Sequence, residues 1–98
     1  MEEHVRIATY KMTKGTAEEA ADLAKSGMLP VFQGKPGFIR YGVALLEDGK
    51  LASISVWETH AEAEDAIAAA ADFVKKNMAD RISIDSNHVG DFFFDESA

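Results

Sequence analysis

Two helix-start signals divide this chain and set the order of its elements. Thr16 is followed three residues later by Glu19, and Thr59 by Glu62. This is the spacing of a capping box, in which each side chain bonds a free backbone N–H of the first helical turn. Alanine-rich segments with helical periodicity follow both signals and predict helices over 17–26 and 61–78. Because 98 residues suffice for one hydrophobic core, we expect a single domain spanning 1–98.

The segments around these helices alternate in the manner of strands. The patterns predict strands over 4–12, 38–46, 51–57 and 89–94, with an irregular polar stretch over 80–88 and a frayed tail over 95–98. Gly27 and Pro30 indicate that the first regular helix ends near Ser26, and Leu29 to Phe32 are expected to form a short second turn with Pro30 near its start. The order strand, helix, strand, strand, helix, strand predicts an α+β fold, the ferredoxin-like βαββαβ plait. In this fold a four-stranded antiparallel sheet carries two helices on one face.

The first three strands carry apolar side chains on both faces. In the first, Val5 and Ile7 share one face while Ala8 and Tyr10 share the other. Two helices cover only one face, and about six apolar side chains left in water, at about 1.5–3 kcal/mol each, would rival the stability of a domain this small. We therefore expect a homodimer packed through its open sheet faces; a monomer with some exposed Val and Ile is the alternative.

The composition excludes several classes of function. Seventeen acidic residues against ten Lys and Arg give a net charge of −7, which does not suit nucleic acid or an anionic membrane. The absence of cysteine excludes thiolate metal sites, iron–sulfur clusters and thiolate nucleophiles. The first residues contain no apolar signal core and no apolar run approaches the length of a membrane span, so a cytoplasmic location is expected.

Three short segments carry a family resemblance. They are Met12-Thr13-Lys14-Gly15-Thr16-Ala17, Lys35-Pro36-Gly37-Phe38 and Ser55-Val56-Trp57-Glu58-Thr59. Their order and spacing over most of the chain are similar to those of the antibiotic biosynthesis monooxygenase domain family. The resemblance implies a dimeric α/β barrel, in which two plaits join sheet to sheet and each holds a ligand cavity between its sheet and its own helices.

The resemblance also implies a range of activities. Some members oxygenate phenols or anthrone-like aromatics without metal or flavin, and others degrade haem with an asparagine on the first strand and a tryptophan and a histidine on the second helix. Here Ala8 takes the asparagine position, and the segment 61–78 contains neither Trp nor His. This favours a cofactor-independent monooxygenase that acts on a small aromatic or polyketide-like molecule, with no cofactor and no metal. A non-catalytic ligand-binding or structural dimer is the alternative.

A few side chains are candidates for this chemistry, which needs a base and stabilisation of a substrate anion. For the catalytic base we expect His88, next to Asn87, or Tyr10, which the resemblance turns toward the cavity. A solvated loop histidine and a core tyrosine are the structural alternatives.

The candidates for substrate binding are Arg6, Arg40, Trp57, His60 and Asn87. Arg40 suits a substrate anion, a dimer contact or a neighbouring acid, and Trp57 suits an aromatic wall or a link between sheet and helix. At a helix N-terminus the dipole is expected to disfavour the charged form of His60. No two of the three histidines have metal-ligand spacing in the sequence.

Overall fold

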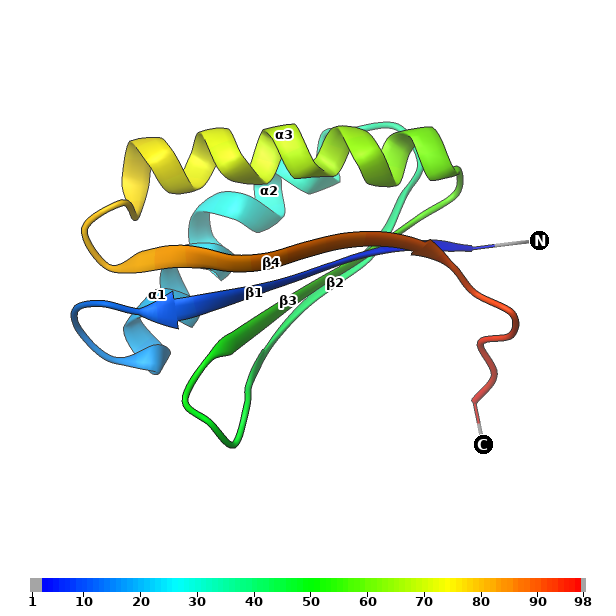
Figure 1. Cartoon of the computed structure of the whole chain (residues 1–98). Coiled ribbons are helices and arrows are strands. Elements are labelled where there is room, and N and C mark those ends of the chain that lie inside the picture. Colours follow the sequence, from blue (N-terminus) through cyan, green and yellow to red (C-terminus); the bar gives the residue numbers. More distant parts are fainter. Residues whose placement is uncertain (1–2, 98) are drawn as a thin grey trace.

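The computed structural model describes residues 3–97 and shows the expected plait (Figure 1). The elements run β1 (His4–Met12), α1 (Ala17–Leu23), η1 (Ala24–Met28), α2 (Leu29–Gln33), β2 (Phe38–Leu45), β3 (Leu51–Trp57), α3 (His60–Asn77) and β4 (Ile82–Asp91). The four strands form one antiparallel sheet in the order β2-β3-β1-β4, and the helices lie together on one of its faces. Both predicted helix starts are confirmed, with Thr16 and Thr59 as N-caps.

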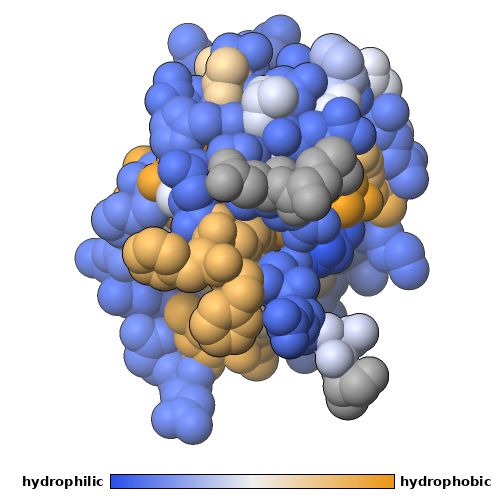
Figure 2. Space-filling view, turned by 90° about the vertical axis from the view of Figure 1, so that its right-hand side faces the viewer, coloured by the Kyte–Doolittle hydropathy of each residue, from blue (hydrophilic) through white to orange (hydrophobic). Residues whose placement is uncertain are grey.

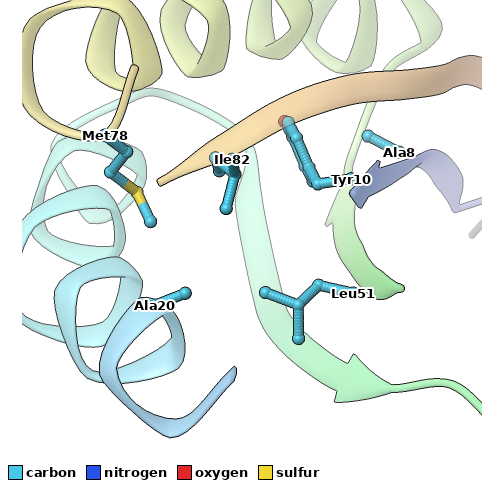
Figure 3. Close-up of a cluster of buried hydrophobic side chains, with 6 residues drawn as sticks. All are labelled: Ala8, Tyr10, Ala20, Leu51, Met78 and Ile82. Carbon is cyan, nitrogen blue, oxygen red and sulfur yellow. The ribbon is translucent and has the colours of Figure 1, made fainter. Parts of the chain in front are cut away.

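Register fixes which side chains of the central strands face the helices. Arg6, Ala8 and Tyr10 of β1 are buried under the helices, whereas Ile7, between them, is 40% exposed on the opposite face. The core lies between sheet and helices in two clusters of buried side chains. One contains Ala8, Tyr10, Ala20, Leu51, Met78 and Ile82 (Figure 3), and the other Met28, Phe32, Trp57, Ala63, Ala66 and Ala70.

The first helical segment continues past the predicted end at Ser26. Its middle turn, η1, is a π-turn in which the Leu29 N–H donates to the Ala24 carbonyl, five residues back. Pro30 then stands in the first turn of α2, the short second turn expected over 29–32. Gly27 is required by close packing, because a Cβ there would lie 2.4 Å from the Phe73 ring of α3.

The last strand is longer and begins earlier than predicted. The segment expected to be irregular, 80–88, supplies most of β4, which pairs with β1 from Met12↔Ile82 to His4↔Asp91. The polar composition reflects its place at the edge of the sheet, where one side of the strand faces water. A bulge beside Thr9 and Tyr10 leaves Asp85 without a partner residue on β1.

The C-terminal tail covers one end of the open sheet face. After β4 the Phe92 N–H donates to the Glu3 carbonyl, and the Asp95 carboxylate pairs with Arg40 on β2, at the far edge of the sheet. The last strand was expected to reach Phe94, but β4 ends at Asp91. Of the tail expected to be frayed, Asp95 is held by Arg40, fraying of Glu96 and Ser97 stays a prediction, and Ala98 lies outside the described residues. Val5 and Val56 of the open face are buried, whereas Ile7 and Ile54 are 40% and 37% exposed.

Large apolar side chains remain in solvent on several elements; they are Ile7, Val31, Leu45, Leu46, Ile54, Ile84, Phe93 and Phe94. Phe93 and Phe94 of the tail are exposed, and Figure 2 shows hydrophobic surface on this side of the molecule. Within residues 3–97, no helix combines the length and the apolarity needed to cross a bilayer. The cytoplasmic location expected from the sequence stays a prediction.

Candidate functional site

The most unusual group under the helices is a buried guanidinium. The side chain of Arg6 on β1 is 1% exposed, and it donates from Nη2 to the Tyr10 hydroxyl at 2.8 Å. Its Nε donates to Asn87 Oδ1 at 3.3 Å and its Nη1 to Ser53 Oγ at 3.4 Å. All three partners are neutral, and no carboxylate in residues 3–97 forms an ion pair with Arg6.

Such a charge is costly to bury without a counter-ion. Moving an ion out of water costs several kcal/mol even after the protein relaxes, and neutral hydrogen bonds of about 1.5–3 kcal/mol each offset this only in part. A bound anion would complete the compensation with a charge-assisted, bidentate pair. The buried guanidinium therefore has the properties of an anion-binding group.

The partners of Arg6 are left with free donors. A guanidinium only donates, so the Tyr10 oxygen accepts from it and the Tyr10 O–H remains available for another acceptor. The same reasoning fixes the Asn87 amide, whose oxygen accepts from Arg6 and whose NH₂ group remains free. Together the three side chains can donate several hydrogen bonds to one anionic oxygen.

These side chains line a pocket of about 410 Å³ between the sheet and the C-terminal half of α3. We call it the Arg6 pocket, and its lining consists of Arg6, Tyr10, Ala71, Val74, Lys75, Ala79, Ile82, Ser83, Ile84 and Asn87. The volume lies within the ~300–1,000 Å³ usual for small-molecule sites. Its walls are largely apolar, and its polar groups are mainly donors, which suits a flat apolar molecule that carries an anionic group.

Tyr10 separates this pocket from a smaller space in the core. A void of about 30 Å³ lies behind it, bounded by side chains that include Tyr41 and Ser53, and Figure 3 shows Tyr10 pointing from β1 into the layer between sheet and helices. Burial raises the pKa of the Tyr41 hydroxyl, and the neighbouring Ser53 hydroxyl acts in the opposite direction. Tyr41 and Ser53 were not predicted as site residues. Their only signal was a position on the helix-facing side of β2 and β3.

Three of the predicted site residues meet in the Arg6 pocket, and His88 does not. Arg6, Tyr10 and Asn87 line it together. His88 pairs with Ile7 and is exposed on the open face of the sheet, on the opposite side from the pocket. The expectation that His88 reaches the cavity is therefore wrong, because β4 begins earlier than predicted and its register turns His88 away.

Arg40 and Trp57 have structural surroundings. Arg40 lies on the open face, where its acidic neighbours Glu3 and Asp95 raise its pKa, the Asp95 hydrogen bond most of all. Trp57 is fully buried, packs edge-on against Phe32 and donates from Nε1 to the Ser55 hydroxyl at 2.9 Å. The residues that line the Arg6 pocket include neither Arg40 nor Trp57.

His60 lies far along α3 from the pocket, at the first residue of the helix. The Asp91 carboxylate, by its hydrogen bond, and the Glu64 carboxylate raise the pKa of His60. The expectation that the helix dipole disfavours its charged form is therefore wrong in direction, since two adjacent carboxylates outweigh the partial charge of a helix end.

Comparisons with known proteins show which solved structures share the fold of this chain. No family model matches the chain, and no curated protein matches its sequence. Among solved structures, it is similar to SnoaB, a cofactor-independent oxygenase from Streptomyces nogalater, with a TM-score of 0.67 and 17% identity over 99% of this chain and 97% of that one.

Two further solved structures give the same result. A candidate antibiotic biosynthesis monooxygenase from Chloroflexus aurantiacus has a TM-score of 0.66 and 14% identity over 97% of both chains. NE2512, a protein of unknown function from Nitrosomonas europaea, has a TM-score of 0.77 and 14% identity over 100% of this chain and 96% of that one. The chain thus has the fold of the antibiotic biosynthesis monooxygenases, as the sequence led us to expect.

Proposed function

We propose that this chain binds a small aromatic molecule with an acidic hydroxyl or carboxylate in the Arg6 pocket and oxygenates it without a cofactor. The observation that carries the proposal is the buried Arg6 guanidinium, which faces neutral partners within a pocket of ligand size. The shared fold with a cofactor-independent oxygenase supports the reaction class.

In this reaction the protein stabilises a substrate anion. Arg6 favours ionisation of a phenol or enol placed beside it, and the Tyr10 hydroxyl and Asn87 amide donate to the same oxygen. The ionised substrate passes one electron to O₂, and the two radicals combine into a peroxide anion that takes up a proton. Loss of water from the peroxide converts a ring CH₂ into a carbonyl, so that one oxygen atom enters the product and the other leaves in water.

A non-catalytic binding protein is the second candidate, and the composition of the pocket favours it specifically. The residues that line the Arg6 pocket include no imidazole and no carboxylate, so they supply no ordinary base. Oxygenation in this pocket therefore requires either Tyr10 as the proton acceptor or a substrate acidic enough to ionise beside Arg6.

Binding and oxygen uptake together test the proposal. We expect hydroxynaphthoates, anthrones or hydroquinones to raise the melting temperature of the wild-type protein, and at least one of them to cause oxygen consumption. Arg6→Met should weaken binding by about a hundredfold, the usual cost of truncating one partner of a buried charge pair. Arg40→Met, which removes an exposed arginine on the other face of the sheet, should leave binding unchanged.

The outcomes separate the two candidates. Binding that depends on Arg6 without oxygen uptake would establish the binding protein and exclude the oxygenase for these substrates. Equal losses in Arg6→Met and Arg40→Met, or no binding across the panel, would contradict the role of the pocket.

We also propose that two copies pack through their open sheet faces. Ile7 and Ile54 at the centre of that face and Phe93 and Phe94 of the tail are exposed in the single chain. Burying such side chains against a second copy would gain about 1.5–3 kcal/mol for each one fully covered. The Arg6 pocket would lie on the other side of the sheet, so that each copy keeps its own site.

A further inference from the structure

Three potential metal ligands meet at one end of the molecule, away from the Arg6 pocket. Asp91 Oδ1 lies 2.6 Å from His4 Nδ1 and 2.8 Å from His60 Nδ1. These atoms all lie within 4.8 Å of one another. Figure 1 shows how the fold assembles them, because β1 starts, α3 starts and β4 ends at the same end of the sheet.

The cluster was hidden in the sequence, where the two histidines are far apart and lack ligand spacing. Pairing of β1 with β4 places His4 directly opposite Asp91, and the turn from β3 into α3 brings His60 against the same carboxylate. Each ligand thus comes from a different element, which is the arrangement of a site that joins segments of a fold.

The distances fit a tetrahedral ion after small shifts. Zinc binds imidazole nitrogen and carboxylate oxygen at about 2.0–2.2 Å, which sets neighbouring ligand atoms about 3.3 Å apart. The present separations of 2.6 and 2.8 Å therefore need to open by roughly half an ångström. Asp91 and His60 are about half exposed and free to adjust, and the exposure leaves room for a water as the fourth ligand.

Glu64 holds the second ring nitrogen of His60. Its carboxylate lies 2.8 Å from His60 Nε2, the ring nitrogen that does not face Asp91. Metal-binding histidines almost always donate their other N–H to a carboxylate, carbonyl or water, which fixes the ring and raises its basicity. His60 already has this arrangement, with one nitrogen directed to the cluster and the other held by an acid.

We propose that His4, His60 and Asp91 form a binding site for a divalent transition metal such as Zn²⁺. Two imidazoles and one carboxylate favour zinc, copper, nickel or cobalt over magnesium and calcium, which prefer oxygen ligands throughout. The ion ties the start of β1, the start of α3 and the end of β4 together, so its role is to stabilise this end of the fold.

Metal binding to untagged, chelator-treated protein tests the site. We expect ZnCl₂ titrated in a calorimeter to bind with one ion per chain. Zinc at a hundredfold above its Kd should raise the melting temperature by about 10 °C. Substituting Co²⁺ should give visible absorption bands typical of a tetrahedral site.

Matched histidine variants make the test specific. His4→Gln and His60→Gln should each abolish zinc binding and the cobalt bands, while their melting temperatures in chelator remain near that of the wild type. His88→Gln removes the third histidine of the chain, which lies on the open sheet face outside the cluster, and should bind zinc as the wild type does. No zinc-dependent shift in the wild type, or an equal shift in His60→Gln, would overturn the proposal.

Discussion

Two arginines show how surroundings decide the role of one residue type. Arg40 lies at the surface with two acids beside it, whereas Arg6 is buried beside a tyrosine, a serine and an asparagine. The exposed ion pairs of Arg40 add little to stability because water screens their charges. The buried charge is much more sensitive to what lies beside it, and this makes Arg6 the residue on which ligand binding depends.

Replacing Arg6 should therefore separate function from stability. We expect Arg6→Met to unfold within about 1 kcal/mol of the wild type in urea, since the substitution removes the desolvation cost of an unpaired buried charge together with its hydrogen bonds to neutral partners. The same variant should lose the ligand-dependent rise in melting temperature. A loss of stability above about 3 kcal/mol would mean instead that the neutral partners satisfy Arg6 and that it holds the core together.

The sequence predicted the face on which a side chain lies wherever the bounds of its strand were predicted correctly. The first strand was predicted with the observed bounds, so Arg6 and Tyr10 were expected on the same face, and both line the pocket. His88 was misplaced because its strand was predicted to begin at Val89, which left its parity undefined. The neutral surroundings of Arg6 depend on residues from three strands and could not be read from the sequence.

At the scale of elements, both errors concern segments whose local signals oppose their tertiary environment. The Ile82-Ser83-Ile84-Asp85 alternation of β4 was outweighed by the polar residues that follow it, although an edge strand tolerates such residues. Gly27 is an ordinary helix-ending signal, yet the π-turn continues the helix past it, whereas the short turn expected over 29–32 with Pro30 near its start is confirmed by α2. In both cases packing outweighed local preference.

Ionic contacts of Asp85 stabilise the bulge in β4, so the stability of the fold depends on pH through this residue. Asp85 accepts from Lys50 at 3.1 Å and from the Thr9 hydroxyl at 3.0 Å, and the Lys50 bond, above all, lowers its pKa. Because the pKa of Asp85 is lower in the folded than in the unfolded state, its ionised carboxylate adds to the free energy of unfolding at any pH above the unfolded-state pKa. This stabilisation is lost as the pH falls through the folded-state pKa.

We therefore expect Asp85→Asn to lower the melting temperature by a few degrees at pH 7. The difference from the wild type should shrink as the pH falls below about 4 and vanish once Asp85 is protonated in both states. Asp72→Asn is the control, because it removes an exposed partner of Lys76 on α3 and should show a smaller effect at pH 7. A deficit in Asp85→Asn that persists unchanged in acid would contradict the ionic account.

For the whole molecule, element order was enough to predict the topology. The capping boxes and strand patterns give the order of the helices and strands, and few topologies fit that order when connections are short and crossovers are right-handed. The observed four-stranded antiparallel sheet is the one that was expected. The cover over the open face was predicted incompletely. Val5 and Val56 of that face are already buried in the single chain, so the exposed area left for a second copy is smaller than the strand patterns suggested.

Assembly in solution tests the proposed pairing of sheet faces. Light scattering coupled to size exclusion should report about twice the 10.7 kDa of one chain at micromolar concentration and neutral pH. Ile7→Glu places a charge at the centre of the open face and should yield monomers. Val31→Glu changes a comparably exposed side chain on α2 and should leave the dimer intact. A wild type that elutes as a single chain would exclude the pairing.

The π-turn at Ala24–Met28 also determines in which direction the side chains of the following turn, α2, point from the helix axis. Phe32, fully buried, meets Trp57 and Tyr41 only because one additional residue was taken into that turn. An α-helix advances about 100° per residue, so removal of any one residue there would swing the Phe32 ring roughly a quarter of the way around the axis and out of the aromatic cluster.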